Sequence, residues 1–219
     1  MSRRSWIILG LFLALVAGGL WYFLGGEGEM KSVGAQGPAP IYEPLPTDHT
    51  SGNPKAKVTL IEYASPTCPV CANFMTNMYP RLKRDYIDTG KIFYVFRTFP
   101  RLADDVAAEK LARCMPKDKY MDFQDSLYRN QAKWDYEFGI PQPDGVHAAL
   151  VELAGAAGMS EADANKCMAS NAEESAITKV GEDGVAKYNV SATPTFVING
   201  QAQAGFEAFF ERLDAALAK

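Results

Sequence analysis

Residues 58–71, VTLIEYASPTCPVC, join an apolar segment to two cysteines that are separated by two residues. The part from Val58 to Ala64 is rich in β-branched and aromatic side chains and is nearly continuously apolar, which is typical of a strand covered on both faces. Cys68 follows at the expected N-cap of a helix, and Pro69 stands at the first helical position, where its missing N–H is harmless. The stretch therefore predicts a buried strand that leads directly into a helix carrying both cysteines.

Further strands and helices follow this stretch. The helix that begins at Pro69 is expected to run to about Asp85, with a kink at Pro80. A second strand is expected over residues 91–99. Strand character returns at residues 195–198, and Asn199-Gly200 predicts a tight hairpin turn into a short strand at residues 201–204. A last helix should bury one apolar face: Phe206, Phe209, Phe210, Leu213 and Leu217.

Between the second strand and the hairpin the sequence is mostly helical. Pro116 and the Gly/Pro cluster at residues 139–145 should divide this block into several helices. Ser160, three residues before Asp163, is typical of a helix start. The first helix of the block should bury a stripe of small or apolar residues: Ala103, Ala107, Leu111 and Cys114. The order of elements predicts a small α/β unit interrupted by a helical insertion at about residues 101–187.

The N-terminal segment indicates export. Arg3 and Arg4 precede an uncharged apolar run at residues 6–24, which would span roughly 28 Å as a helix, close to the thickness of a bilayer. The two arginines favour a cytoplasmic N-terminus at residues 1–5, with the rest of the chain outside. A cleaved signal peptide is the alternative, although Leu15 fits a cleavage site poorly. Both interpretations export the domain.

Residues 25–46 are rich in Gly and Pro and are expected to form a linker, with a short strand near Ile41 and Tyr42. The catalytic domain is expected at residues 47–219. With 47% hydrophobic residues, the chain can bury a core. Its 22 basic and 26 acidic residues, a net charge of -4, argue against nucleic acid as a partner.

Cys68 and Cys71 are the centre of the expected chemistry. Two cysteines at this spacing suit either a redox disulfide or half of a zinc site. The start of a helix favours redox chemistry, because free N–H groups and the helix dipole stabilise a thiolate at Cys68. A stabilised thiolate makes the disulfide more oxidising and makes Cys68 a good leaving group.

Glu62 is the one acidic residue in the first strand. A buried carboxyl is costly unless it has a role, and a carboxyl with a raised pKa could carry a proton to and from Cys71. If the strand were less buried than its sequence suggests, Glu62 would simply be solvated. Thr193-Pro194 precedes the returning strand, and its peptide bond could be trans, the commoner form, or cis, leaving the backbone of Thr193 free for an extended substrate.

These motifs together resemble the DsbA-like thioredoxin superfamily. The resemblance covers residues 48–219 and rests on Glu62, Thr67-Cys68-Pro69-Val70-Cys71, Phe96-Arg97-Thr98-Phe99-Pro100 and Thr193-Pro194-Thr195-Phe196-Val197-Ile198-Asn199-Gly200. It implies a thioredoxin-like fold with a helical insertion. By position, Cys68 resembles the exposed nucleophile, Cys71 the buried partner, Glu62 the buried acid and Pro194 the cis-proline. We expect Pro69, Val70, Thr193 and Pro194 to meet the substrate.

The resemblance implies a periplasmic thiol:disulfide oxidoreductase that introduces disulfides into unfolded or folding exported proteins and needs no cofactor. A single-pass anchor in the bacterial inner membrane would hold it, and a DsbB-like quinone reductase would reoxidise it. Val70 stands where DsbA usually has His, and Thr193 resembles the residue of disulfide isomerases. An isomerase or reductase, kept reduced by a DsbD-like partner, therefore stays open.

Two further cysteines, Cys114 and Cys167, lie outside the motif at residues 68–71. Each lies on the apolar side of an expected helix, so both could be buried free thiols. In an oxidising compartment, and by resemblance to some DsbA relatives, a structural disulfide between them is the prediction. A module that holds copper or zinc is the alternative from another class, but no metal site is expected because only one cysteine pair has suitable spacing. His49 and His147 are expected to be solvated or capping residues.

Overall fold

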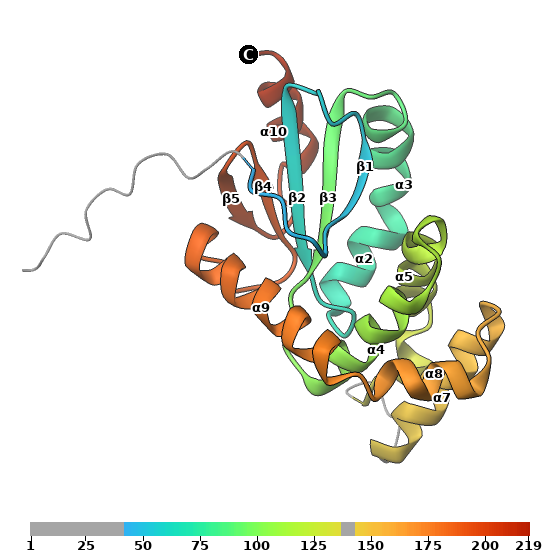
Figure 1. The fold of residues 1–219 in the computed structure, drawn as a ribbon. Helices are drawn as coiled ribbons and strands as arrows, with labels where there is room; N and C mark the ends of the chain where they lie inside the picture. Colours follow the sequence, from blue (N-terminus) through green and yellow to red (C-terminus); the bar gives the residue numbers. More distant parts are fainter. Residues whose placement is uncertain (1–41, 137–142) are drawn as a thin grey trace, which may run out of the picture. The chain divides into compact units, whose positions relative to one another are not determined.

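Strand β2 (Val58–Ala64) lies at the centre of a mixed sheet, and each of its residues is buried. It pairs in parallel with β3 (Ile92–Thr98) on one side and antiparallel with β4 (Thr195–Ile198) on the other. Two short strands, β1 (His49–Gly52) and β5 (Gln201–Ala204), form the edges, so the strand order is β1-β3-β2-β4-β5 (Figure 1). The central position explains the apolar sequence of β2, because both of its faces are covered.

The structure is a computed structural model that describes residues 42–136 and 143–219. The chain divides into two units after Gly37, and all of the described residues belong to the second unit. The expected membrane segment and most of the expected linker lie outside the described residues. Within the two described ranges, no helix has both the length and the apolarity that a bilayer-spanning segment requires.

Helices surround the sheet and fill the expected insertion. Helix α2 (Pro69–Asn77) follows β2, and α3 (Tyr79–Leu82) with the π-helical turn η1 (Lys83–Ile87) leads on to β3. Helix α10 (Phe209–Leu217) ends the chain. The helices between β3 and β4 are α4 (Ala103–Cys114), the 3-10 turn η2 (Lys117–Lys119), α5 (Tyr120–Arg129), α6 (Gln131–Trp134), α7 (Pro143–Ala156), α8 (Glu161–Met168) and α9 (Asn171–Tyr188).

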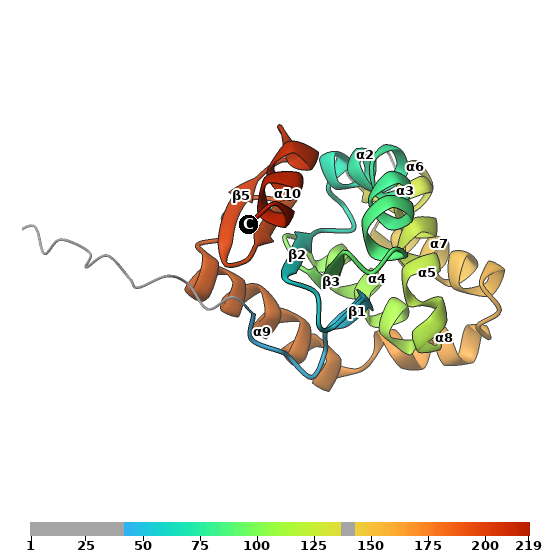
Figure 2. The ribbon, with the colours of Figure 1, turned by 90° about the horizontal axis from the view of Figure 1, so that it is seen from above.

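The two faces of the sheet have separate cores. On one face Ile61 and Tyr63 of β2 pack with Val180 and Tyr188 of α9. On the other face Val58, Leu60 and Ala64, alternate residues of β2, belong to one core cluster with residues of α2 and α10. Figure 2 shows these two helices and α9 from above. Glu62 is another of these alternate residues. The alternation of a strand therefore directs its side chain towards the helix that carries Cys71.

Most of the expected elements are confirmed. Strands β2, β4 and β5 have the predicted bounds, and β3 lies within residues 91–99. The helix after Cys68 breaks at Met78, because Pro80 has no N–H to bond the carbonyl of Thr76. Ser160 caps α8 by accepting a hydrogen bond from the backbone N–H of Asp163. The α/β sheet interrupted by a helical insertion is the fold that the sequence predicted.

The start of the domain differs from the prediction. No strand forms at Tyr42, and the missed strand β1 begins at His49 instead. Tyr42 and Leu45, assigned to the linker from the Gly/Pro content around them, pack against the core on the α9 side of the sheet. The Tyr42 hydroxyl also donates a hydrogen bond to Asp48 at 2.9 Å. The apolar side chains of these residues, and not the overall composition, decide their position.

The predicted apolar face of α4 is confirmed only in part, since Leu111 is buried and Ala107 packs against the core. Ala103 and Cys114 are exposed, whereas Asp105 and Glu109 are buried together with Leu111. Both carboxyl groups accept several hydrogen bonds, which compensates for their burial. The buried face of α4 is therefore shifted from the predicted one, because the side of the helix that is turned to the domain interior is partly polar.

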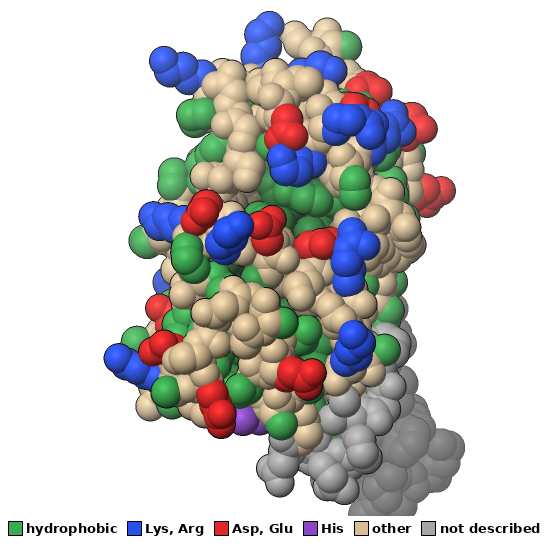
Figure 3. Space-filling view, turned by 90° about the vertical axis from the view of Figure 1, so that its right-hand side faces the viewer, with side chains coloured by type: hydrophobic (Ala, Val, Ile, Leu, Met, Phe, Trp, Pro, Cys, Tyr) green, Lys and Arg blue, Asp and Glu red, His purple; other side chains and the backbone are tan. Residues whose placement is uncertain are grey.

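The interpretation of His49 as a solvated residue is also wrong. Its ring stacks on Tyr120 with 3.2 Å between ring centroids, and burial lowers its pKa to about 4, helped by the charge of Arg113. His147 is exposed, as expected, and contacts Asn165. On the face drawn in Figure 3, acidic and basic side chains alternate and form no large basic patch.

Candidate active site

Cys68 and Cys71 lie at the start of α2, on the face of the sheet opposite to α9. Cys68 has the extended backbone of an N-cap, and its carbonyl accepts the hydrogen bond of the Ala72 N–H at 3.0 Å. Both cysteines are free thiols in the structure. Cys71 is fully buried at 0% exposure, because α2 turns it towards Glu62 and the core.

Cys68 is less exposed than the family pattern implied. Only 4% of its surface is accessible, whereas Pro69 and Val70 beside it are exposed. The reason is the direction of its sulfur, which lies 3.3 Å from the backbone oxygen of Thr193. The carbonyl of Thr193 therefore covers one side of the Cys68 sulfur.

The two sulfurs have opposite electrostatic environments. A hydrogen bond from the Cys71 thiol is the largest effect that lowers the pKa of Cys68, to about 5, and the backbone N–H groups of Val70 and Cys71 add to it. Burial and the neighbouring Cys68 raise the pKa of Cys71 well above its ordinary value. The sulfur of Cys68 is thus stabilised as a thiolate, whereas the sulfur of Cys71 keeps its proton.

Glu62 lies beneath this pair. Its side chain is completely buried, and burial raises the pKa of its carboxyl to about 8 although a hydrogen bond from Tyr94 opposes the shift. Oε2 accepts that bond at 2.8 Å. The second oxygen, Oε1, has no hydrogen-bond partner among the residues that the structure describes. A carboxyl with this pKa can both hold and release a proton near neutral pH.

Thr193 and Pro194 face the reactive sulfur from the other side. The peptide bond between them is cis, so the alternative left open by the sequence is decided. The Thr193 hydroxyl has no partner within the described residues while Cys68 is a thiol, and it lowers the pKa of Cys68 by donating to the thiolate. Pro69 and Val70 are exposed beside Cys68 and Thr193 contacts its sulfur, whereas Pro194 is buried. A substrate contact at these four residues stays a prediction.

A family comparison agrees with this geometry. The family model described as thioredoxin, Thioredoxin_4, matches residues 45–217. The structure of α-DsbA1 from Wolbachia pipientis superposes with a TM-score of 0.72 at 27% identity, over 81% of this chain and 94% of that one. The chain is a DsbA-like member of the thioredoxin family.

Other relatives of this DsbA-like chain carry related names. A Rickettsia typhi protein named as a protein-disulfide oxidoreductase is 33% identical over 70% of this chain and 55% of its own length. The chain thus spans about half the length of the Rickettsia relatives it matches. Disulfide bond formation protein D of Bacillus subtilis is 26% identical over 73% of this chain and 71% of its own.

The second cysteine pair of the DsbA-like domain lies in the insertion. Cys114 at the end of α4 and Cys167 in α8 are joined by a disulfide across 53 residues of sequence. Neither sulfur contacts the start of α2, because both lie in helices of the insertion. Among the described residues, no cluster of His, Cys, Asp and Glu could hold a metal ion.

Three residues that contact the site were not singled out from the sequence. Tyr94 bonds Glu62, while Asp105 and Gln131 bond the turn between β2 and Cys68. Tyr94 could have been found, because it alternates with Phe96 on one face of a predicted strand beside Glu62. Asp105 and Gln131 left no such signal, since the groups that they bond in this turn are far away in the sequence.

Proposed function

We propose that the protein is a thiol:disulfide oxidoreductase that introduces disulfides into exported proteins through Cys68 and Cys71. The observation that carries this proposal is the opposite shift of the two pKa values at the start of α2. A stabilised thiolate favours the dithiol over the disulfide, so the disulfide form is a good acceptor of electrons. The names of the relatives support the same class of activity.

The reaction begins with the Cys68–Cys71 disulfide. A substrate thiolate attacks the sulfur of Cys68, forming a mixed disulfide, and Cys71 leaves as a thiolate. A second substrate thiol then attacks the substrate sulfur of the mixed disulfide and releases Cys68. The substrate gains one disulfide and loses two electrons and two protons, and the enzyme is left as the dithiol.

Glu62 has the proton-carrying role in this proposal. The leaving sulfur of Cys71 is buried, so its charge has to be neutralised without bulk water. The Glu62 carboxyl, with a pKa of about 8, is largely protonated at neutral pH and can supply that proton. In the reverse direction its carboxylate can remove the proton and prepare Cys71 for attack.

The remaining parts of the proposal concern place and partners. The N-terminal apolar segment supports a single-pass anchor in the bacterial inner membrane, with the domain in the periplasm. Unfolded or folding exported proteins are the proposed substrates. A DsbB-like membrane quinone reductase is the proposed oxidant that restores the disulfide.

An isomerase or reductase is the second candidate. Two observations favour it: Thr193 is the residue beside the reactive sulfur, and the side chain of Val70 supplies no charge or hydrogen bond there. Such a protein would work as the dithiol, supplied with electrons by a DsbD-like partner. It would use the same two cysteines and differ only in redox potential.

The deciding experiment is the equilibrium potential of the Cys68–Cys71 pair, measured against glutathione in the domain without its anchor. A value between about −120 mV, as in DsbA, and about −270 mV, as in thioredoxin, is expected. A value nearer the DsbA end supports the oxidase, and one near the thioredoxin end favours the second candidate. If no disulfide forms at any glutathione ratio, both candidates are excluded.

A further inference from the structure

The turn from Ser65 to Thr67 connects β2 to the reactive cysteine. All three of its residues are buried. The carbonyl of Ser65 accepts a hydrogen bond from the Cys68 N–H at 3.0 Å. Its length is too short for regular secondary structure, so its remaining polar groups need partners from elsewhere.

One side of this turn is held by Asp105 of α4, which is completely buried. Its Oδ1 accepts hydrogen bonds from the Ser65 hydroxyl and the Thr67 N–H, both at 2.8 Å. Its Oδ2 accepts from the N–H groups of Arg101 and Leu102 at 2.7 and 3.0 Å. One carboxylate thus joins the turn to the beginning of the insertion.

The other side is held by Gln131, the first residue of α6. Its side-chain Nε2 donates to the carbonyl oxygen of Pro66 at 2.6 Å and to that of Cys68 at 3.1 Å. The residue is 7% exposed. Helix α6 is itself anchored by Trp134, which is buried and donates from its indole N–H to the carbonyl of Leu127 at 2.8 Å.

From these contacts we infer that Gln131 is a positioning residue through which the helical insertion sets the redox equilibrium of the Cys68–Cys71 pair. The inference rests on the proposed roles of the two cysteines. The amide of Gln131 opposes the partial negative charge of two carbonyl oxygens, one of which belongs to the reactive residue itself. It also fixes the N-cap geometry on which the thiolate at Cys68 depends.

Loss of the Gln131 amide should make the Cys68 thiolate less stable relative to the thiol. Without the two hydrogen bonds the carbonyl oxygens keep their full partial charge near the sulfur, and the first turn of α2 is free to move. The dithiol form is then less favoured, so a more reducing glutathione buffer is needed to open the disulfide. The effect expected from hydrogen bonds of this kind is a shift of the equilibrium constant by about threefold to tenfold.

Gln131→Met is the main test, because it keeps the length of the side chain and removes its donors. Gln131→Glu is the second variant, since it turns a negatively charged acceptor towards the same two carbonyls and should shift the equilibrium further in the same direction. Asp105 is less suitable for a test, because it also accepts hydrogen bonds from the N–H groups of Arg101 and Leu102 just before α4. The readouts are the glutathione equilibrium constant and the pKa of Cys68 from thiolate absorbance.

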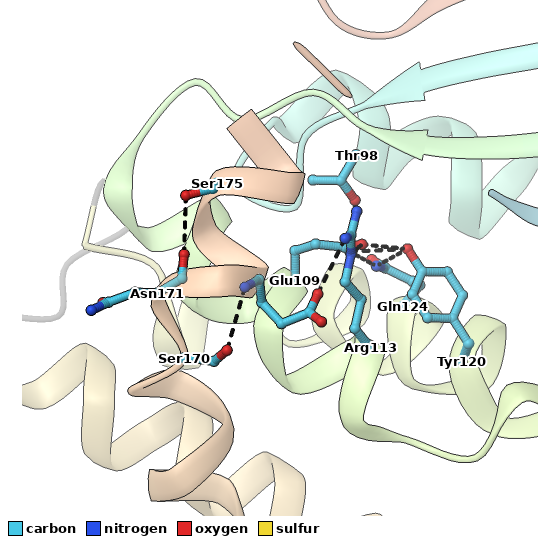
Figure 4. Close-up of polar contacts among 9 residues, drawn as sticks. Thr98, Glu109, Arg113, Tyr120, Gln124, Ser170, Asn171 and Ser175 are labelled. Atoms are coloured by element: carbon cyan, nitrogen blue, oxygen red, sulfur yellow. Dashed lines mark hydrogen bonds and ion pairs between the residues drawn. The ribbon is translucent and has the colours of Figure 1, made fainter. Parts of the chain in front are cut away.

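Gln124→Met is the matched control. Gln124 is a fully buried glutamine of the same insertion, and its amide donates to Glu109 at 2.7 Å and to Tyr120 at 3.0 Å. Figure 4 shows it among the side chains of Thr98, Glu109 and Tyr120. It makes no hydrogen bond to the turn at residues 65–67. Its substitution should lower the melting temperature and leave the redox equilibrium unchanged.

The outcomes separate the inference from the proposed function. A shift in both Gln131 variants, with no shift in Gln124→Met, supports the inference. Equal shifts in the Gln131 and Gln124 variants would mean a general loosening of the insertion and would overturn it, as would a Gln131→Met protein with wild-type equilibrium and wild-type Cys68 pKa. If the wild-type pair forms no disulfide in glutathione buffers, the proposed function itself fails.

Discussion

The chain carries two pairs of cysteines that differ in almost every physical respect. Cys68 and Cys71 are three residues apart at the start of one helix, are free thiols and have pKa values shifted in opposite directions. Cys114 and Cys167 are 53 residues apart on two helices and are joined in a disulfide. Cys114 is exposed, whereas Cys68 is almost completely buried.

The comparison teaches that the surroundings, and not exposure, separate the two kinds of pair. The first pair combines a helix start, a buried acid and the backbone of Thr193 within one small region. The second pair joins the end of α4 to α8 through a disulfide that spans 53 residues of sequence. Reactivity is therefore expected at the buried pair, and constraint of the chain at the more exposed one.

The strongest test of this difference removes the reactive sulfur. Cys68→Ser should abolish oxidation of a dithiol peptide in glutathione buffer, because it removes the sulfur whose thiolate is stabilised. Thiolate absorbance with a midpoint near pH 5 should disappear in the same variant. The double variant Cys114→Ser with Cys167→Ser is the control. It should retain both the peptide oxidation and the thiolate absorbance. Peptide oxidation that persists in Cys68→Ser would place the chemistry at another residue.

Removal of the second pair should act on stability instead. In the chain-entropy description, a loop of 53 residues corresponds to about 4 kcal/mol as an upper estimate. Cys114→Ser with Cys167→Ser should therefore lower the free energy of unfolding by up to about 4 kcal/mol in urea denaturation. The glutathione potential of the Cys68–Cys71 pair should stay the same. Two free thiols at these positions in protein isolated from an oxidising compartment would contradict the prediction.

Glu62→Gln should remove one contribution to the pH dependence of the free energy of unfolding. The folded protein holds the Glu62 proton to about pH 8, whereas the unfolded chain releases it near its ordinary pKa of 4.5. Between these values the unfolded state binds fewer protons, so this group makes stability fall as pH rises, by about 1.4 kcal/mol per pH unit at most. The Gln variant should lack this slope, which urea denaturation across pH 5 to 8 would reveal.

The same substitution should slow the chemistry, since Gln keeps the size of Glu but carries no proton. Reduction of the Cys68–Cys71 disulfide by a dithiol, followed by stopped flow near neutral pH, should be about tenfold slower or more. The glutathione potential should move little, because the role is kinetic. Tyr94→Phe is a useful companion, as it removes the hydrogen bond to Glu62 without removing the carboxyl. Unchanged rates on both sides of neutral pH in Glu62→Gln would exclude a proton-carrying role.

Val70→His should have the smallest effect. Val70 is 47% exposed, so a histidine there would add a hydrogen bond or a solvent-screened charge near the Cys68 thiolate. We expect the pKa of Cys68 to fall by less than about one unit, which corresponds to no more than about 30 mV in the potential. Thiolate titration and glutathione equilibration both measure this. A fall in the potential would show that Val70 already favours the oxidising form.

The central elements were predictable because their signals are local. The apolar run of β2, the missing N–H of Pro80 and the Asn199-Gly200 turn each determine structure within a few residues. The acid in the apolar strand also identified Glu62 as a candidate site residue. Strand β1, with the sequence HTSG, carries no such signal, because its place depends on pairing with β3.

The insertion was less predictable because its buried face is polar. Asp105 and Glu109 occupy positions of α4 that a hydrophobic pattern assigns to solvent, and their hydrogen bonds reach residues far away in the sequence. Gln131 escaped attention for the same reason. The low exposure of Cys68 depends on Thr193, which is 125 residues away and approaches only through the pairing of β4 with β2.

The edges of the sheet have a consequence for handling unfolded chains. Unpaired N–H and C=O groups on an edge strand offer a template to any extended polypeptide, and this is a common route to aggregation. Strands β1 and β5 are each four residues long, and the sequences HTSG and QAQA contain no large aliphatic side chain. An extended chain would therefore find little to pair with at either edge. If the proposed substrates are unfolded chains, we expect these short polar edges to limit co-aggregation with them.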